Sequence, residues 1–532
     1  MNAFFIVIYA ICAVYILLNF KHDLQMFQQN SYRISRYWKW LSRGDLDSAW
    51  RLVDVACLFL LCAPQLLEIR LASLFVGLTL LVKIFLILRR KAKKPLVFTK
   101  RVWRQYITTA ILALGGGTAI AICTAGKWYG IYYSAALTLG YGMMVTIFSW
   151  AVVIISATLL SPVEKYIQNR YIRDAKRILR SKPDLKVIGI TGSYGKTSTK
   201  HYLTRILQEK YDVLMTPGSF NTPMGVVRTV REYLKPYNEI FVCEMGAKQL
   251  GDIKEICNIV HPEMGIVTAV GPMHLESFKS IENVCTTKFE LIDALPSTGF
   301  AAVNNDFEMC ADRKVDNCTV ARYGVTNTAG CQYWAGDIRY SADGTRFKVY
   351  GPDNFELELE TRLLGECNVS DLLAAVVIAH KLGVSPEQIK YAVGSIQQVE
   401  HRLSVKQTPG GVTILDDAFN SNPAGSRMAV DVLSHFTTGK RIIVTPGMIE
   451  LGDRQMELNR GLGIQIGEKL DVAIIVGKYN REALVSGIEK TGFNKENLII
   501  VDSFNEAQQR LAMILKPGDT VLYENDLPDT FK

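Results

Sequence analysis

The residues best suited to chemistry lie in one short stretch, KVIGITGSYGKTST at residues 186–199. An apolar run leads into a glycine-rich turn, and a segment with helical periodicity follows. Backbone N–H groups of such a turn, together with a helix N-terminus, cradle phosphate oxygens. Lys196 can reach the β- and γ-phosphates, and Thr197 can hold Mg²⁺. The stretch predicts a nucleotide site made of Gly192, Ser193, Tyr194, Gly195, Lys196, Thr197 and Ser198.

Four further positions could serve the same chemistry, but their surroundings in the sequence leave alternatives open. Glu244 follows the predicted strand Glu239–Cys243. An acid at such a strand end is a usual second Mg²⁺ ligand, and it is equally often structural. His274 reads by itself as a surface histidine, and Lys288 as a solvated charge on a helix. The segment Asn221–Gly225 suits either a substrate contact or an ordinary helix cap.

The spacing of the glycine-rich turn is unusual. A common phosphate loop has glycine five residues before Gly195, where this chain has Ile190. The variant resembles the ATP loop of the Mur ligases, which build the peptidoglycan stem peptide. Further matches follow in that family's order and cover about 185–520: EMGAKQLGDI (244–253), HLESFKS (274–280), TKFELIDALP (287–296), GECNVSDLLAA (365–375), HRL (401–403), DDAFNSNP (416–423) and GMIELG (447–452). The last two are most similar to the MurF branch, which attaches D-alanyl-D-alanine to UDP-MurNAc-tripeptide.

The resemblance implies an ATP-dependent amide-bond ligase that works through an acyl phosphate, with ATP and Mg²⁺ bound. It implies that Lys196, Glu244, His274 and Lys288 are catalytic, with Thr197, Glu244 and His274 on the metal. Lys288 would add a carboxylate for a second Mg²⁺ if it is carbamylated. For the nucleotide, Asn368 would contact adenine, Arg402 a phosphate and Asp417 the ribose, with turn or capping roles as the alternative. Substrate would face Asn221, Thr222, Asn420 and Asn422.

The chain also departs from the family, beside the adenine asparagine and, more seriously, on the substrate side. Cys367 and Asp371 stand where histidine and a second asparagine are usual, and an apolar region stands where the family has its UDP-sugar domain. The C-terminal end lacks the basic stretch with which MurF enzymes finish. We therefore expect D-alanyl-D-alanine or a related amine to join a carboxylate-bearing wall precursor. The alternatives are a ligase acting on a lipid-linked precursor or another envelope polymer, and a non-catalytic ATP-sensing scaffold.

Composition separates the chain into two halves. Hydrophobic residues make up 49% of the 532 residues, and the mean hydropathy is +0.12. Residues 1–188 carry a net charge of +17, whereas residues 189–532 carry −8. A nucleic-acid protein should gather its basic residues on the globular part, so we expect no nucleic-acid partner. The eleven cysteines include no CxxC pair, which argues against a disulfide framework or a zinc site.

The basic half reads as a membrane region with about five spanning helices. Basic loops at Lys21–Arg51, 89–104 and Lys165–Lys186 predict that the N-terminus lies outside and the C-terminus inside. Asp54 and Lys83 sit near helix ends or can snorkel, so an anchor is favoured over a transport path. The apolar runs are Ala3–Phe20, Leu52–Leu67, Leu71–Leu88, Ile107–Ala125 and one crossing within Tyr129–Leu160, which could be a long tilted helix or a helix with a re-entrant piece.

The expected domains are a transmembrane region (1–162), a basic segment (163–184), a central ATP-binding domain (185–400) and a C-terminal domain (401–532). Glu164–Arg180 reads either as a basic amphipathic helix on the membrane surface or as a helical linker. From 185 onward, strands alternate with helices, which predicts P-loop and Rossmann-like α/β domains with parallel sheets. Residues 318–360 read as a small antiparallel insert. The expected location is the bacterial plasma membrane, with catalytic domains in the cytoplasm and with membrane lipid and other envelope-synthesis proteins as partners.

Overall fold

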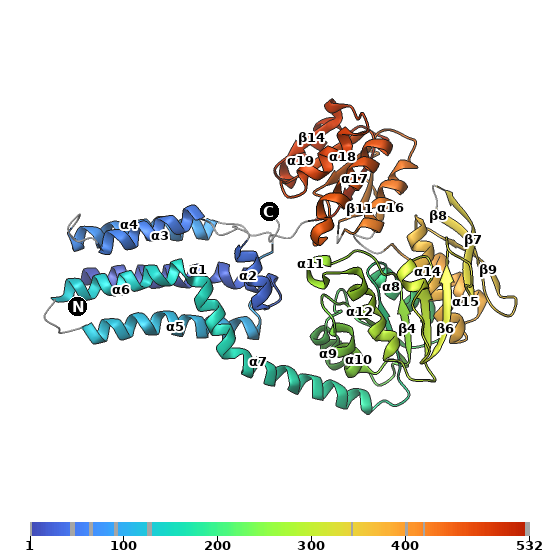
Figure 1. Cartoon of the computed structure of the whole chain (residues 1–532), viewed down its shortest axis with the longest axis horizontal. Coiled ribbons are helices and arrows are strands. Elements are labelled where there is room, and N and C mark those ends of the chain that lie inside the picture. The colour runs from blue at the N-terminus through green and yellow to red at the C-terminus, as the bar shows by residue number, and fades with distance from the viewer. Residues whose placement is uncertain are drawn as a thin grey trace. The chain divides into compact units, whose positions relative to one another are not determined.

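The computed structural model describes residues 3–42, 48–62, 68–89, 94–124, 130–341, 344–398, 403–418 and 421–526. It divides into two compact units (Figure 1). Unit 1 is Met1–Gln168 and unit 2 is Asn169–Leu527. The expected basic segment forms no unit of its own, because helix α7 (Ser149–Arg180) crosses the boundary without a break.

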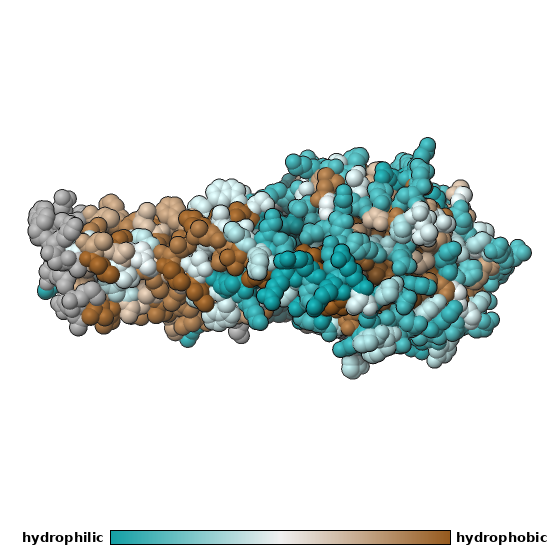
Figure 2. All heavy atoms as spheres, turned by 90° about the horizontal axis from the view of Figure 1, so that it is seen from below, coloured by the Kyte–Doolittle hydropathy of each residue, from teal (hydrophilic) through white to brown (hydrophobic). Residues whose placement is uncertain are grey.

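Unit 1 is helical, and most of its helices are apolar. Four are long and apolar enough to cross a membrane: α1 (Ala3–Gln29), α4 (Ile69–Arg89), α5 (Lys100–Thr124) and α7. The shorter helices are α2 (Ile34–Ser42), α3 (Ser48–Cys62) and α6 (Gly130–Ile147). The apolar run within Tyr129–Leu160 divides at Phe148, between α6 and α7. Figure 2 shows hydrophobic residues over most of the visible face of this unit.

The two charged residues noted within the apolar runs are buried and paired. Lys83 donates to Asp54 Oδ1 at 2.6 Å and to the Trp50 carbonyl at 2.9 Å. The other carboxylate oxygen of Asp54 accepts the Tyr15 hydroxyl at 2.9 Å. The expectation that these charges sit near helix ends or snorkel was wrong, because each helix by itself does not reveal the partner that a neighbouring helix supplies.

The central part of unit 2 is one nine-stranded sheet in the order β2-β3-β1-β4-β5-β6-β7-β8-β9. The strands from β2 through β7 pair in parallel, whereas β7, β8 and β9 are antiparallel. The predicted small insert is therefore part of the main sheet, and its first strand, β6, belongs to the parallel portion. Bounds are β1 (Lys186–Thr191), β2 (Val213–Met215), β3 (Ile240–Glu244), β4 (Met264–Val267), β5 (Phe300–Asn304), β6 (Thr319–Gly324), β7 (Tyr333–Ser341), β8 (Gly344–Tyr350) and β9 (Glu356–Thr361).

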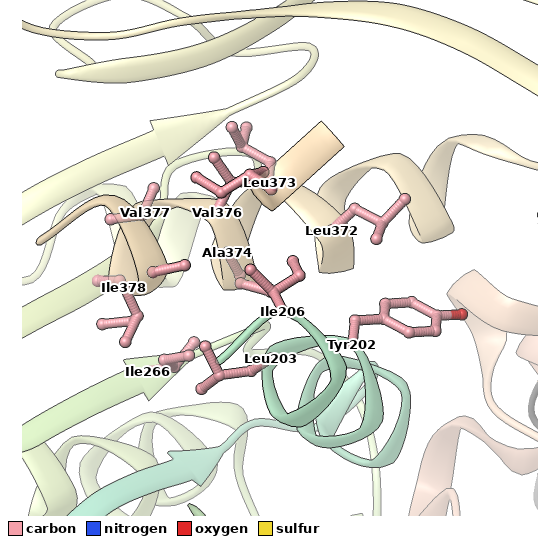
Figure 3. Packing of buried hydrophobic residues seen from close by; sticks show 14 of the residues in the cluster. Tyr202, Leu203, Ile206, Ile266, Leu372, Leu373, Ala374, Val376, Val377 and Ile378 are labelled. Atoms are coloured by element: carbon pink, nitrogen blue, oxygen red, sulfur yellow. The ribbon is translucent and has the colours of Figure 1, made fainter. Parts of the chain in front are cut away.

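Helices cover both faces of this sheet, as parallel strands require. On one face, Tyr202, Leu203 and Ile206 of α8 pack against apolar residues of α14 (Figure 3). On the other face, α9, α10 and α12 form a second core, which the end of α7 joins through the fully buried Ala175. Bounds are α8 (Lys196–Leu207), α9 (Pro223–Glu232), α10 (Asp252–Val260), α11 (Leu275–Phe278), α12 (Ile281–Asp293), α13 (Glu308–Ala311), α14 (Glu366–Lys381) and α15 (Pro386–Ser395).

The C-terminal part of unit 2 has a six-stranded sheet in the order β10-β11-β15-β12-β13-β14. All pairs are parallel except β10–β11, an edge that the sequence did not reveal. The strands are β10 (Ser404–Gln407), β11 (Thr413–Asp417), β12 (Arg441–Thr445), β13 (Val472–Val476), β14 (Leu498–Val501) and β15 (Thr520–Glu524). The helices are α16 (Pro423–Ser434), α17 (Gln455–Lys469), α18 (Arg481–Glu489), α19 (Phe504–Ile514) and the short η1 (Gly452–Arg454) and η2 (Lys495–Asn497).

Candidate active site

The phosphate-binding turn lies between β1 and α8, where β1 sits between β3 and β4 in the sheet. Gly195 precedes α8 with φ +76°, and the helix has no side-chain cap. Its first N–H groups therefore point from an uncapped helix end, which suits an anionic group. A Cβ on Gly195 would lie 2.1 Å from Asp371 Oδ1, so only glycine fits there.

Two of the predicted nucleotide residues hold the turn in place through their side chains. The Ser193 hydroxyl lies 3.2 Å from the Gly271 carbonyl, and the Tyr194 hydroxyl donates to the Pro272 carbonyl at 3.4 Å. Both contacts fix the turn against the segment after β4. Any nucleotide contact from these residues would therefore come from their backbone groups.

Thr197 and Glu244 meet at the carboxyl ends of β1 and β3. The Thr197 hydroxyl donates to Glu244 Oε1 at 3.2 Å. Lys196 folds back on the turn, with Nζ at 2.7 Å from the Gly192 carbonyl and 3.1 Å from the Ser193 carbonyl. The prediction that Glu244 ends a strand next to the phosphate-binding turn is confirmed by the pairing of β1 with β3.

Glu244 is buried and surrounded by donors, of which Lys200 is one that the sequence did not identify. Lys200, which is fully buried, lies 3.3 Å from Oε2 and donates to the Gly218 carbonyl at 2.7 Å. Asn221 donates to Oε1 at 3.0 Å. Burial alone would raise the pKa of Glu244, but the charges of Lys200 and Lys196 hold it below its ordinary value. The carboxylate is therefore ionised at neutral pH.

These oxygen donors fit Mg²⁺. Mg²⁺ is held by one or two carboxylates together with phosphate and water oxygens. Glu244 Oε2 is buried without a hydrogen bond, and Thr197 offers a hydroxyl beside Oε1. Within the described ranges of the chain, His, Cys, Asp and Glu side chains form no group of three or more suited to a metal. The phosphate oxygens of a nucleotide would suit the remaining positions of the shell around Glu244 and Thr197.

Lys288 lies on α12 and is buried. Burial, reinforced by the charge of Lys196, holds the pKa of Lys288 well below its usual range. A neutral amine is the form that reacts with CO₂, so the surroundings of Lys288 suit carbamate formation. The sequence alone favoured a solvated charge at this position, and that interpretation was wrong.

His274 contacts Glu450 through Nδ1, and both residues have left-handed backbone conformations. Burial lowers the pKa of His274, while Glu450 opposes the shift. The residue lies at the start of the short helix α11, and its metal role stays a prediction.

Other predicted residues form hydrogen bonds within the protein. Asn368 accepts the Tyr202 hydroxyl at 2.7 Å and donates to the Leu364 carbonyl at 2.8 Å. Asp417 accepts the Leu403 N–H at 3.1 Å. Arg402 and Asn420 lie outside the described residues.

Two candidate substrate residues cap helices. Thr222 accepts the Gly225 N–H at the start of α9, and Asn422 accepts the same type of bond at the start of α16. Asn221, by contrast, reaches Glu244. The structure thus gives Thr222 and Asn422 capping roles, and gives Asn221 a contact with Glu244.

The missed residue with the clearest signal is Lys200. It lies one helical turn after Lys196, a spacing that places both on one face of α8. Its burial could not be read from the sequence, because charged helix residues are normally solvated.

Comparisons with known proteins agree with this geometry. Residues 190–379 match the Mur ligase middle domain, and residues 401–523 match the Mur ligase glutamate ligase domain. The chain is 32% identical to the UDP-N-acetylmuramoyl-tripeptide–D-alanyl-D-alanine ligase of Mycobacterium tuberculosis (strain CDC 1551 / Oshkosh), over 64% of this chain and 70% of that protein. It is 28% identical to the enzyme of the same name from Bacillus subtilis, over 64% and 72%.

Solved structures show the same fold. MurF from Acinetobacter baumannii aligns with a TM-score of 0.62 and 26% identity, covering 68% of this chain and 78% of that one. MurF from Thermotoga maritima, solved with ADP, aligns with a TM-score of 0.59 and 26% identity, covering 68% and 80%. The chain therefore belongs to the Mur ligase family, whose members are ATP-dependent, ADP-forming ligases, and it is such an enzyme.

Proposed function

We propose that this enzyme is membrane-anchored and joins D-alanyl-D-alanine, or a related amine, to a carboxylate of a peptidoglycan precursor. The observation that carries the reaction type is the Thr197–Glu244 junction beside an uncapped phosphate-binding turn. The substrate pair is supported by the names of the relatives, which are UDP-N-acetylmuramoyl-tripeptide–D-alanyl-D-alanine ligases.

In this proposal a substrate carboxylate attacks the γ-phosphorus of ATP, and ADP leaves. The amine then attacks the acyl carbon, phosphate leaves with the C–O bond electrons, and the amine loses a proton. Lys196 would turn from the carbonyls of Gly192 and Ser193 toward the phosphates and offset their charge. Bound Mg²⁺ would supply further positive charge for both steps. Glu244 and Thr197 would orient it.

Lys288 would act as a carbamate. Its neutral amine adds to CO₂, with loss of a proton, and gains a carboxylate that can hold a second Mg²⁺. The lowered pKa of Lys288 supports this role because it increases the fraction of the amine that is neutral and can react with CO₂. His274, Asn368, Arg402 and Asp417 keep their predicted roles toward the metal, adenine, phosphate and ribose.

The test is a direct assay of the full-length protein in detergent with ATP, Mg²⁺ and bicarbonate. Phosphate release and product mass are followed with UDP-MurNAc-tripeptide and D-alanyl-D-alanine. We expect a pentapeptide product in step with ADP formation, and no product from a Lys196→Ala variant. ATP binding without product would overturn this substrate pair.

The membrane location rests on unit 1, with its four helices of spanning length and its exposed apolar surface. We propose five crossings, with α6 and the start of α7 making the last one together. The N-terminus then lies outside and unit 2 lies in the cytoplasm. Cys62 and Cys123, exposed at the ends of α3 and α5, would face outward.

These two cysteines give the topology a test. A membrane-impermeant maleimide added to intact spheroplasts should label Cys62 and Cys123. Cys318 and Cys331, in unit 2, should react only after permeabilisation. Labelling in the reverse order would contradict the proposed orientation, and recovery of the protein in the soluble fraction would contradict the anchor.

A second acceptor class deserves a parallel assay because unit 1 favours it. A membrane-held enzyme gains local concentration toward a lipid-linked acceptor but none toward a soluble one. The same protein in lipid nanodiscs would therefore be supplied with a lipid-linked muramyl peptide and D-alanyl-D-alanine. A higher kcat/KM for the lipid-linked acceptor than for the UDP-linked one would establish this alternative.

A further inference from the structure

The C-terminal half of helix α7 belongs to unit 2, and one face of it is covered by the rest of that unit. This half contributes Ala175 to the core below the central sheet. Arg231 of α9 binds Asp174 at 2.7 Å and lies 4.3 Å from the centre of the Tyr171 ring. The sequence allowed the apolar face of this segment to lie on a membrane surface. The structure shows that this face contacts protein instead. Its partly buried members are Tyr171, Ile172, Ile178 and Leu179.

The opposite face of α7 is exposed and changes in character along the helix. Apolar residues come first, a tyrosine follows and arginines complete the series. Successive members are three or four residues apart, which at about 100° per residue confines them to one arc opposite Ala175. They are Ile155, Leu159, Val163, Tyr166, Arg170, Arg173, Arg177 and Arg180.

This order matches the layers of a membrane surface. Apolar residues suit the hydrocarbon, tyrosine suits the headgroup level and arginine suits the phosphate layer. The arginines also stand out against their domain, since residues 189–532 carry a net charge of −8. Such a domain is repelled by an anionic surface unless a basic patch faces it.

We propose that Arg170, Arg173, Arg177 and Arg180 bind the phosphates of anionic phospholipids and so dock unit 2 on the cytoplasmic membrane surface. The inference rests on the membrane location proposed above. We name these four residues the arginine stripe. Arg177 pairs with Asp174 at 2.9 Å, yet its side chain is 81% exposed and open to a second anion.

The docked state places a condition on α7. A straight helix leaving along the membrane normal would carry Arg180 about 21 Å beyond Tyr166. Charges interact across only about 8 Å at physiological ionic strength. The helix must therefore lie along the surface, and Pro162, inside α7, is a position where a helix can bend.

The test uses the full-length protein in nanodiscs of phosphatidylcholine, with or without 30% phosphatidylglycerol. Ser181→Cys, at an exposed position directly after the stripe, supplies the only reactive cysteine and carries a fluorophore. Serine replaces the exposed or half-exposed cysteines Cys62, Cys123, Cys318, Cys331 and Cys367. Lipids with a nitroxide on the headgroup quench the fluorophore when α7 lies on the surface. We expect strong quenching only in anionic discs, and its loss at 0.5 M NaCl.

The stripe variant R170Q/R173Q/R177Q/R180Q should abolish this quenching, since each arginine near an anionic surface contributes about fivefold to the docking equilibrium. The matched control K490Q/K495Q/R510Q/K516Q removes four exposed charges elsewhere on unit 2 and should leave the quenching intact. Equal quenching in neutral and anionic discs, or in the stripe variant, would overturn the inference. Failure of the chain to enter nanodiscs would instead refute the membrane anchor. Turnover of the stripe variant on a soluble acceptor reports separately on the ligase proposal.

Discussion

The two units each bury a lysine–carboxylate pair, and the pairs differ in whether their hydrogen bonds are complete. In unit 1, Asp54 uses both oxygens, one toward Lys83 and the other toward Tyr15. In unit 2, Glu244 uses Oε1 for two donors, while Oε2 has only the ion pair with Lys200 at 3.3 Å and accepts no hydrogen bond.

Burying a charge lowers the free energy of unfolding unless its hydrogen bonds are made. A buried carboxylate with an unbonded oxygen is therefore expected only where another role compensates for that cost. The closed pair of unit 1 is what a structural connection between helices requires. The open pair of unit 2 lies at the carboxyl ends of parallel strands beside a phosphate-binding turn, where a cation and a nucleotide would complete it. In this protein, the buried carboxylate with bonding capacity left over is the one that lies beside the phosphate-binding turn.

Removing the negative charge of Glu244 should have the largest effect on activity. Glu244→Gln keeps the size of the side chain but removes the charge that would orient Mg²⁺. We expect the rate of phosphate release to fall at least about 10³-fold, measured as kcat in the coupled assay. Asp54→Asn is the control in unit 1, and its folded fraction should turn over normally. A similar loss for both variants would erase the distinction between the pairs.

Removing one member of the Lys83–Asp54 pair should instead lower the free energy of unfolding. Lys83→Met leaves Asp54 buried without its cation, which costs about 3–5 kcal/mol in proteins. The measurement is the unfolding midpoint of the full-length chain in detergent. The double variant K83M/D54N removes both charges and should recover part of the loss. If the double variant is as unstable as the single one, the charges themselves are not what stabilises unit 1.

Lys200 tests the electrostatics of the open pair. Lys200→Met removes the positive charge that holds the pKa of Glu244 low, so burial then raises that pKa. Glu244 should therefore be protonated, and lose Mg²⁺, at a higher pH than in the parent protein. We expect Mg²⁺-dependent ADP binding at pH 6 to weaken about tenfold, with a smaller change at pH 8. Calorimetry measures this, and Lys200→Arg, which keeps the charge, should weaken binding less.

Two adjacent residues, Asn221 and Thr222, distinguish a contact in the active site from a helix cap. Thr222→Ala removes the cap of α9 and should lower stability by about 1 kcal/mol with little change in KM. Asn221→Ala removes a donor to Glu244 and should alter kcat or KM with a smaller change in stability. Steady-state kinetics and thermal unfolding on both variants decide the matter, and identical profiles would contradict the assignment.

The smallest effect concerns a histidine beside the open pair. Burial, together with the charge of Lys200, lowers the pKa of His201 to about 4, below the unfolded value of about 6.5. Between these values only the unfolded state binds the proton, so this contribution to stability is complete above about pH 6.5 and is lost as the pH falls toward 4. His201→Gln should reduce the loss of stability between pH 7 and pH 5 by about 1 kcal/mol, measured by denaturant titration. An unchanged pH dependence would show that His201 is not buried enough to resist protonation.

Much of the fold could be predicted because its signals are local. The strand, turn and helix around Gly195, the apolar runs of unit 1 and most strands of both sheets follow from periodicity within short windows. Residues 318–360 show the limit. Their alternating pattern indicated strands but could not show that β6 pairs in parallel with β5, since that pairing joins residues about twenty positions apart.

The sequence by itself determined the family, the phosphate-binding turn and the division into an apolar basic half and an acidic α/β half. These follow from residue order and composition. Only the tertiary structure decided that Lys83 meets Asp54, that Lys200 meets Glu244 and that unit 2 covers one face of α7. The physical reason is that a charge or an apolar face has the same local pattern whether solvent, lipid or another helix covers it. Its energy depends on that neighbour, which only the folded chain supplies.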